Sequence, residues 1–284
     1  MKILSYVRLA RPKHWLKNVL VFLPILYAQN LFVPDLLLPT LFTFLAFCLL
    51  SSTVYVLNDI ADCKQDAKHP IKKNRPIASG TISISQGLLF AFFLLLTALG
   101  IAFFAVGYWV FFFALAYLLL NLAYSFSLKH QPVIDCFCIA AGFILRIYAG
   151  GSAAGAPITY WLFLTMTAAS LFMAFGKRRG EFLQLAGKEH TRKVLASYNL
   201  AFLNGMTFLS AGLAIVFYAL WSMGASNHML YTVPFVFFIV ARYLLLLHKD
   251  TCHGDPVSMI FADKTLLTGI FSLGVFSLIL LYWY

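Results

Sequence analysis

Three carboxylates and one amide lie close together where a long apolar run ends. Asn58, Asp62 and Asp66 are spaced i, i+4, i+8 and would share one face of a helix, with Asp59 at the edge of that face. Like charges at this spacing repel each other, and carboxylates beside so apolar a run lose hydration. Mg²⁺ would relieve both costs, because it prefers oxygen ligands. The pattern N-D-x-x-D-x-x-x-D therefore predicts a magnesium site held by these four residues, with the aspartates acting in catalysis.

Basic residues follow this acidic stretch directly. Lys72, Lys73 and Arg75 are three cations suited to binding a diphosphate beside a metal ion. Together the two stretches predict a site for a magnesium diphosphate. The alternative is a solvated helix end in which the aspartates pair with Lys64 and Lys68, as runs of charge commonly do.

A second polar stretch, YSFSLKHQPVID, runs from Tyr124 to Asp135 between two apolar segments. Lys129 either belongs to the site or only marks the cytoplasmic side of the membrane. Asp135 could pair with Lys129 or cap the helix that follows. Arg146 lies inside the next apolar segment, where an arginine is costly and normally faces a polar cavity. Asp135 and Arg146 are about three helical turns apart, so both could line one cavity.

A third polar stretch, GKRRGE, runs from Gly176 to Glu181 and is expected in the loop after the sixth apolar segment. Its basic residues could do no more than fix the orientation of the chain in the membrane. Alternatively, Lys177 and Arg178 could bind a phosphate group.

The elements that must position these residues follow from the composition. Hydrophobic residues make up 62% of the 284 residues and charged residues only 11%, against about 25% charged in a soluble domain. The apolar runs are continuous and lack the alternation of barrel strands, which indicates an all-α membrane protein. Nine runs approach the ~20 residues that cross a bilayer. They are 18–34, 36–57, 83–105, 108–126, 132–153, 158–175, 197–222, 229–248 and 265–284.

Basic residues are distributed asymmetrically about these nine spans. Nineteen of the 21 Lys and Arg residues lie in the N-terminal tail or in alternate loops, and the opposite loops have none. This pattern predicts a cytoplasmic N-terminus and an external C-terminus. It also accounts for the net charge of +11 without a nucleic acid partner. Because no soluble domain fits between the spans, we expect residues 1–284 to form a single transmembrane domain.

Taken together, these motifs resemble the UbiA superfamily of membrane prenyltransferases. The pattern N-D-x-x-D-x-x-x-D, here from Asn58 to Asp66, is similar to the first acidic motif of that family. The resemblance covers essentially the whole chain. It implies a fold of nine transmembrane helices around a central cavity that opens toward the cytoplasm and the lipid, and a membrane-embedded transferase that uses Mg²⁺.

Four segments resemble one branch of the superfamily, the decaprenyl-phosphate phosphoribosyltransferases. They are RPKHWLKN (11–18), HPIKKNRPIASG (69–80), YSFSLKHQPVID (124–135) and GKRRGE (176–181). Other members have a second acidic motif, D-x-x-x-D, after the sixth helix, where this chain has basic residues and only Glu181 and Glu189. The resemblance implies transfer of the 5-phosphoribosyl group from phosphoribosyl diphosphate to a polyprenyl phosphate, with release of diphosphate, in cell wall biosynthesis.

The resemblance also implies roles for single residues and a place in the cell. Donor phosphates would be bound by Lys17, Lys72, Lys73, Arg75, Tyr124 and Lys129, and the acceptor phosphate by Lys177 and Arg178, while Asp135 and Arg146 would line the cavity. The enzyme would be a multi-pass protein of a bacterial inner membrane, and the sequence leaves oligomer formation open.

Two other functions stay open. A polyprenyl transferase acting on an aromatic acceptor, in quinone or haem synthesis, would use the same aspartates for a prenyl diphosphate, but the missing second motif disfavours it. A secondary transporter could carry Asp135 and Arg146 along its pathway. Its binding site would lie near the bilayer midplane, whereas the aspartates of this chain cluster at one interface.

Overall fold

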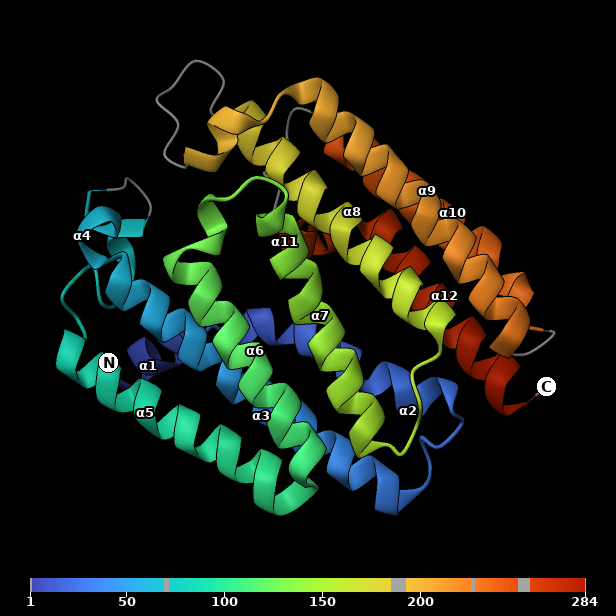
Figure 1. Ribbon diagram of the computed structural model, residues 1–284, viewed down its shortest axis with the longest axis horizontal. Coiled ribbons are helices and arrows are strands. Elements are labelled where there is room, and N and C mark those ends of the chain that lie inside the picture. Colours follow the sequence, from blue (N-terminus) through green and yellow to red (C-terminus); the bar gives the residue numbers. More distant parts are fainter. Residues whose placement is uncertain (1, 69–71, 185–192, 226–227, 250–255, 284) are drawn as a thin grey trace. The chain divides into compact units, whose positions relative to one another are not determined.

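The computed structural model describes residues 2–68, 72–184, 193–225, 228–249 and 256–283, and within these ranges it contains helices and no strand (Figure 1). The helices are α1 (Lys2–Ala10), the 3-10 helix η1 (Pro12–Phe22), α2 (Leu23–Tyr27), α3 (Pro34–Ala61), α4 (Cys63–Asp66), α5 (Ile84–Gly100), the π-helix η3 (Ile101–Val106), α6 (Tyr108–Phe126), α7 (Ile134–Ala153), α8 (Tyr160–Gln184), α9 (Leu200–Ala225), α10 (Val233–Leu247), α11 (Pro256–Ala262) and α12 (Lys264–Tyr282). Short 3-10 turns lie at Lys72–Asn74, Leu128–His130, Lys193–Ser197 and Met229–Thr232. The prediction of an all-α chain is confirmed.

Seven of the described helical segments are long and apolar enough to cross a membrane. They are α3, α5 with η3, α6, α7, α9, α10 with the turn before it, and α12. Several apolar helices of this length confirm a multi-pass membrane protein. The count of nine spans and the central cavity stay predictions.

Two segments differ from the nine-span expectation. The segment predicted at 18–34 is not one α-helix, because the 3-10 helix η1 is followed by the five-residue α2. Pro24 lies in the first turn of α2, where its missing N–H and fixed φ favour the start of a new helix. The other segment is α8, which continues to Gln184 and so includes GKRRGE. The prediction that GKRRGE lies in a loop was wrong. Arg178 and Arg179 of this stretch are buried within the helix.

The chain divides into two compact units. The first consists of residues 1–125 and 145–157, and the second of residues 126–144 and 158–284. Helix α7 contributes its first half to the second unit and its second half to the first. The single-domain expectation for residues 1–284 stays a prediction.

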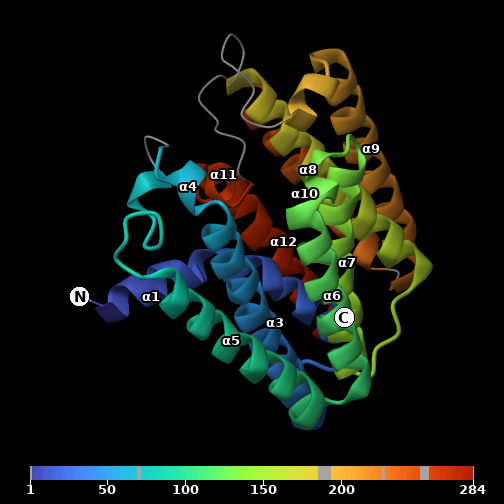
Figure 2. The same cartoon turned by 60° about the vertical axis from the view of Figure 1, so that its left-hand side comes forward.

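Helix α3 is the centre of the first unit. It packs against α1, η1 and α5, and both views show α5 running beside it (Figures 1 and 2). Phe47 and Leu50 of α3 are fully buried in an apolar cluster with Tyr117 of α6. A Cβ atom on Gly150 would lie 2.0 Å from the carbonyl oxygen of Val21, so glycine is required where the end of α7 meets η1. The apolar core of this unit therefore fixes the segment that leads into α3.

The second unit is built on the pair α8 and α9, which run side by side in both views (Figures 1 and 2). Helix α10 packs against α9 and α12. A Cβ atom on Gly176 would lie 2.8 Å from Cδ1 of Leu247, the last residue of α10. The glycine that opens GKRRGE thus lets α8 approach the end of α10 closely.

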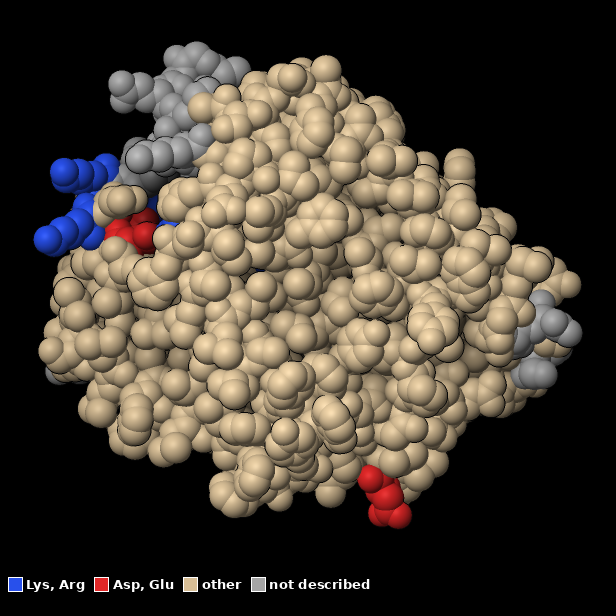
Figure 3. Space-filling model, in the orientation of Figure 1, with Lys and Arg blue, Asp and Glu red and all other residues tan. Residues whose placement is uncertain are grey.

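Charged side chains are rare on the face drawn in Figure 3, and most of them gather at the end where α4 lies. Large apolar side chains are exposed elsewhere, for example Phe92 of α5 and Phe104 of η3. Many exposed apolar side chains of this size are typical of a protein that faces lipid. The charged end is therefore the place to search for chemistry on a polar substrate.

Candidate active site

The acidic stretch lies on two helices joined at Asp62. Helix α3 ends at Ala61, Asp62 is its C-terminal cap, and α4 begins at Cys63. Helical hydrogen bonds nevertheless run from the Asp62 N–H to the Asn58 carbonyl and from the Asp66 N–H to the Asp62 carbonyl, both 2.9 Å. The i, i+4, i+8 relation survives along the backbone, although one continuous helix does not.

The side-chain contacts do not follow the i, i+4, i+8 spacing. Nη1 of Arg75 lies 3.0 Å from Oδ1 of Asp59 and 2.5 Å from Oδ2 of Asp66. Both carboxylates are almost fully buried. Asn58 and Asp62 are half-buried, and the Asn58 amide oxygen accepts a hydrogen bond of 2.7 Å from the Ser125 hydroxyl. Asp59 and Asp66 are thus the two carboxylates that converge on one cation.

Arg11 is a member of this site to which the sequence analysis assigned no role, although it opens the segment RPKHWLKN. Its Nη2 lies 2.6 Å from Oδ1 of Asp59, and its guanidinium carbon lies 5.1 Å from the centre of the Tyr55 ring. On the other side, Nζ of Lys72 lies 4.0 Å from Oδ1 of Asp66. The signal in the sequence was the resemblance of RPKHWLKN to one branch of the family, but the spacing of these residues alone points to no partner for Arg11.

The carboxylate pair fits Mg²⁺. Among the described residues, no three His, Cys, Asp or Glu side chains form a group that could hold a metal ion. Mg²⁺ typically takes one or two protein carboxylates and completes its shell with substrate phosphates and water. Asp59 and Asp66 supply that number, and their pairing through one nitrogen of Arg75 shows that both reach a single cation. Asn58 and Asp62 as metal ligands stay a prediction.

The other residues predicted to bind donor phosphates lie in several elements. Lys17 is half-buried in η1, Tyr124 is half-buried in α6, and Lys73 is exposed in the turn Lys72–Asn74. Lys129 is half-buried in a turn of the second unit. Their contacts with a donor stay predictions.

A second charged cluster lies in the second unit around Asp135. Nε of Arg178 lies 2.5 Å from Oδ2 of Asp135, and Nη1 of Arg178 lies 2.6 Å from Oε2 of Glu181. The Tyr198 hydroxyl donates to Oδ1 of Asp135 at 2.7 Å and accepts the N–H of Val133 at 2.6 Å. The side chains of Asp135 and Arg178 are 0% and 1% exposed, whereas that of Glu181 is 22% exposed, so the ion pair at the centre of this cluster is buried.

Burial and the Asp135 carboxylate raise the pKa of Tyr198, so the phenol keeps its proton and donates it to that carboxylate. Val133, which donates to the same phenol, has a φ of +69°, an unusual value for a β-branched residue. Sequence reasoning missed Tyr198 completely, because it lies 63 residues from its partner.

The second arginine of GKRRGE is also enclosed. Nε of Arg179 donates to the Asn204 amide oxygen at 2.6 Å, and its Nη1 donates to the carbonyl oxygen of Leu247 at 2.5 Å. The two arginines therefore tie α8 to α7, α9 and α10. A phosphate that approached Arg178 would compete with two carboxylates, so the geometry favours a positioning role. Acceptor binding by Lys177 and Arg178 stays a prediction.

Arg146 is buried in the first unit among polar groups. Its Nε donates to the Asn18 amide oxygen at 2.6 Å, and its Nη2 donates to the Tyr117 hydroxyl at 2.9 Å. The Asn18 amide in turn donates to the Ser51 hydroxyl at 3.2 Å. Asp135 and Arg146 thus bind separate groups in separate units, and a shared cavity for them stays a prediction.

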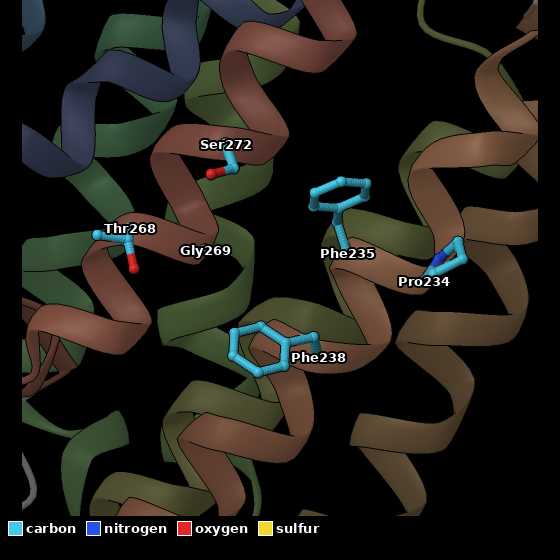
Figure 4. A pocket seen from close by; sticks show the side chains of 6 residues that line it. All are labelled: Pro234, Phe235, Phe238, Thr268, Gly269 and Ser272. Carbon is cyan, nitrogen blue, oxygen red and sulfur yellow. The ribbon is translucent and has the colours of Figure 1, made fainter.

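An apolar pocket lies between α10 and α12 of the second unit (Figure 4). Its volume is about 380 Å³, and it is lined by Pro234, Phe235, Phe238, Thr268, Gly269 and Ser272. The hydroxyls of Thr268 and Ser272 are the polar side-chain groups of this lining, which contains no charged residue. The pocket is therefore unsuited to a diphosphate.

The site and the fold define a class of protein. The chain belongs to the UbiA prenyltransferase family, whose family model matches residues 18–263. It is accordingly a membrane-embedded transferase, as the sequence indicated.

Comparison with individual proteins is more informative than the family model, because it gives relatives that share one name. The chain is 34% identical to the decaprenyl-phosphate phosphoribosyltransferase of Corynebacterium glutamicum, across 92% of this chain and 81% of that protein. It is 33% identical to the proteins of the same name from Mycolicibacterium smegmatis and Mycobacterium tuberculosis, across 92% of this chain and 87% and 88% of theirs.

Solved structures share the fold. A UbiA homologue from Archaeoglobus fulgidus, bound to GPP and Mg²⁺, superposes with a TM-score of 0.74 at 18% identity, covering 95% of this chain and 99% of that one. A digeranylgeranylglyceryl phosphate synthase superposes with a TM-score of 0.67 at 19% identity, covering 98% of both chains. These likenesses confirm a UbiA fold.

Proposed function

We propose that the chain transfers the 5-phosphoribosyl group of phosphoribosyl diphosphate to a polyprenyl phosphate and releases diphosphate. The observation that carries the proposal is the 33–34% identity over 92% of the chain to proteins named decaprenyl-phosphate phosphoribosyltransferase. The convergence of Asp59 and Asp66 on one cation supports it, because a diphosphate donor needs such a metal site.

In this reaction the bond between the ribose C1 and the diphosphate oxygen breaks, and a phosphate oxygen of the acceptor forms the new bond to C1. Asp59 and Asp66 would hold Mg²⁺, which would supply positive charge for the departing diphosphate. Lys72, Lys73 and Arg75 would add positive charge on the same group. The neighbouring carboxylates would stabilise the oxocarbenium-like charge that develops at C1.

No protein base is needed in this scheme. A phosphate monoester has a second pKa of ~6, so the acceptor is already a nucleophilic anion at pH 7. The protein contributes positioning and preorganised charge. We further propose an inner-membrane location with the N-terminus and the acidic site on the cytoplasmic side, which the distribution of Lys and Arg supports.

The direct test uses purified protein in lipid nanodiscs with Mg²⁺, ¹⁴C-labelled phosphoribosyl diphosphate and decaprenyl phosphate. We expect a labelled lipid that disappears when EDTA is added. A parallel reaction with geranyl diphosphate and 4-hydroxybenzoate tests the second candidate, prenyl transfer to an aromatic acceptor. That candidate is motivated by 29% identity to a 4-hydroxybenzoate octaprenyltransferase of Neisseria meningitidis over 56% of this chain. Formation of a prenylated aromatic, without labelled lipid, would overturn the proposal.

A transporter makes a different prediction. Reconstituted vesicles would accumulate labelled phosphoribosyl diphosphate without chemical change. We expect no such accumulation beyond the level of empty vesicles, and the label should instead appear in the lipid fraction.

A further inference from the structure

Two guanidinium groups occupy the carboxylates that we assign to the metal. Oδ1 of Asp59 accepts from Nη2 of Arg11 at 2.6 Å and from Nη1 of Arg75 at 3.0 Å. The same Arg75 nitrogen lies 2.5 Å from Asp66. The arginine side chains are 23% and 27% exposed, whereas those of the two aspartates are only 3% and 4% exposed. The cations therefore form the outer layer of the site, and the carboxylates form its inner layer.

We propose that Arg11 is a further donor-site residue, and that Arg11 and Arg75 move from the carboxylates to the diphosphate when Mg²⁺ binds. The arginines hold the carboxylates in the absence of metal and become diphosphate ligands in its presence. The inference rests on the proposed function to the extent that the donor carries a diphosphate.

Charge balance favours this exchange. Asp59 and Asp66 carry two negative charges, which Arg11 and Arg75 balance, and Lys72 adds a further positive charge 4.0 Å from Asp66. A Mg²⁺ ion bound at Oδ1 of Asp59 would compete with both guanidinium groups for that oxygen, and a displaced guanidinium would lie beside the metal with no carboxylate to balance its charge. A diphosphate brings the negative charge that pairs with the released guanidinium groups. Metal and diphosphate therefore bind weakly alone and strongly together.

The backbone around Arg11 is built to hold this side chain in place. Arg11 has a φ of +53°, a left-handed conformation that is uncommon for a residue other than glycine. The Ser52 hydroxyl donates to the Ala10 carbonyl at 2.8 Å and accepts the Trp15 indole N–H at 2.9 Å, which fixes the chain on both sides of Arg11. The guanidinium packs against the Tyr55 ring. The guanidinium can thus change partners while its backbone stays fixed.

The experiment measures binding rather than turnover. Isothermal titration of the full-length protein in nanodiscs gives the Kd of Mg²⁺ alone, of inorganic diphosphate alone, and of each in the presence of the other. We expect each ligand to tighten binding of the other by more than about tenfold, with equal factors in both directions as linkage requires. Independent binding of the two ligands would overturn the inference.

The Arg11→Gln variant separates exchange from simple electrostatics, because its two effects have opposite signs. Binding of Mg²⁺ alone should become tighter, since one competing cation is gone. Binding of diphosphate in the presence of Mg²⁺ should weaken by about tenfold, since a charge-assisted hydrogen bond is lost. The control is Lys13→Gln, which removes the same charge from an exposed side chain two residues away. If Arg11→Gln changes both affinities in the same direction, or only as much as Lys13→Gln does, the inference is wrong.

If the Arg11→Gln variant does not fold, the Arg11→Lys variant takes its place in the binding experiment. Lysine keeps the charge but not the planar fork of donors, so diphosphate affinity with Mg²⁺ should lie between those of the wild type and the Gln variant. Wild-type affinities in Arg11→Lys would also contradict the inference. Because inorganic diphosphate is the probe, coupled binding without any phosphoribosyl transfer would overturn the proposed function and leave this inference standing.

Discussion

The two charged clusters use the same residue types in opposite ways. In the first unit, Asp59 and Asp66 are buried beneath Arg11, Arg75 and Lys72, whose side chains are 23–47% exposed. In the second unit, Arg178 is itself buried, between Asp135 and Glu181, and a tyrosine hydroxyl completes the shell of Asp135. One cluster presents its cations to solvent, and the other encloses its cation.

This difference separates chemistry from architecture. A partly exposed guanidinium can exchange one anion for another at small cost, since water solvates the intermediate states. A fully buried ion pair cannot lose one partner without leaving an uncompensated charge. We therefore expect substitutions in the first cluster to reduce activity and substitutions in the second to reduce stability.

Arg178→Ala is the change with the largest expected effect. It leaves Asp135 buried without its guanidinium, which should cost about 3–5 kcal/mol of folding free energy. Denaturation in SDS–detergent mixtures, followed by circular dichroism, measures this loss. Lys177→Ala, on the neighbouring half-buried side chain, is the matched control and should change stability by much less. An Arg178→Ala protein of wild-type stability with a raised KM for polyprenyl phosphate would support acceptor binding and break the comparison.

Asp66→Asn should reduce activity and leave stability almost unchanged, the reverse of Arg178→Ala. If Asp66 holds Mg²⁺ as proposed, loss of its charge should slow transfer by at least about a hundredfold, equivalent to about 2.7 kcal/mol in the barrier. Thermal stability should remain close to that of the wild type. The control is Asp35→Asn, at an exposed carboxylate in the first turn of α3, which should keep full activity. Residual activity above about a tenth of wild type would exclude Asp66 as a metal ligand.

Tyr198→Phe tests the buried cluster around Asp135 with a smaller change. The ring, which stacks on Phe202 with 5.8 Å between centroids, is retained, while the hydrogen bonds to Asp135 and Val133 are lost. Leaving the buried carboxylate and N–H without this partner should cost about 1–3 kcal/mol. The same denaturation assay measures the loss, and the KM for phosphoribosyl diphosphate should not change. A catalytic defect at unchanged stability would show that the second cluster takes part in the reaction.

The smallest effect concerns the half-buried pair of Arg242 with Asp263, whose nearest atoms are 2.7 Å apart. The hydrogen bond from Arg242 holds the pKa of Asp263 below its usual value. A lowered pKa in the folded state contributes stability above the unfolded value of ~3.9, and that stability is lost as the pH falls below it. Melting temperatures recorded from pH 6 to pH 3 should therefore fall slightly more for the wild type than for Asp263→Asn. Identical pH profiles would contradict this assignment.

Much of the protein could be predicted from its amino-acid sequence. Long apolar runs require helices in lipid, because every backbone N–H and C=O must be satisfied within its own segment. The charges from Asn58 to Asp66 indicated a metal site, since carboxylates beside an apolar run need a compensating cation, and the resemblance of this motif indicated the family. The helices follow from local composition, and the acidic motif follows from the spacing of residues close together in the chain.

The ion-pair partners of the buried aspartates could be identified only from the tertiary structure. Asp59 and Arg11 are 48 residues apart in the chain, and Asp135 and Arg178 are 43 apart, so no local spacing relates them. The sequence could not distinguish GKRRGE as a loop from GKRRGE inside α8, because the cost of burying two arginines depends on whether Asp135 and the end of α10 lie within reach. Which charges face a substrate and which hold helices together is decided by packing, since burial sets the energy of each ion pair.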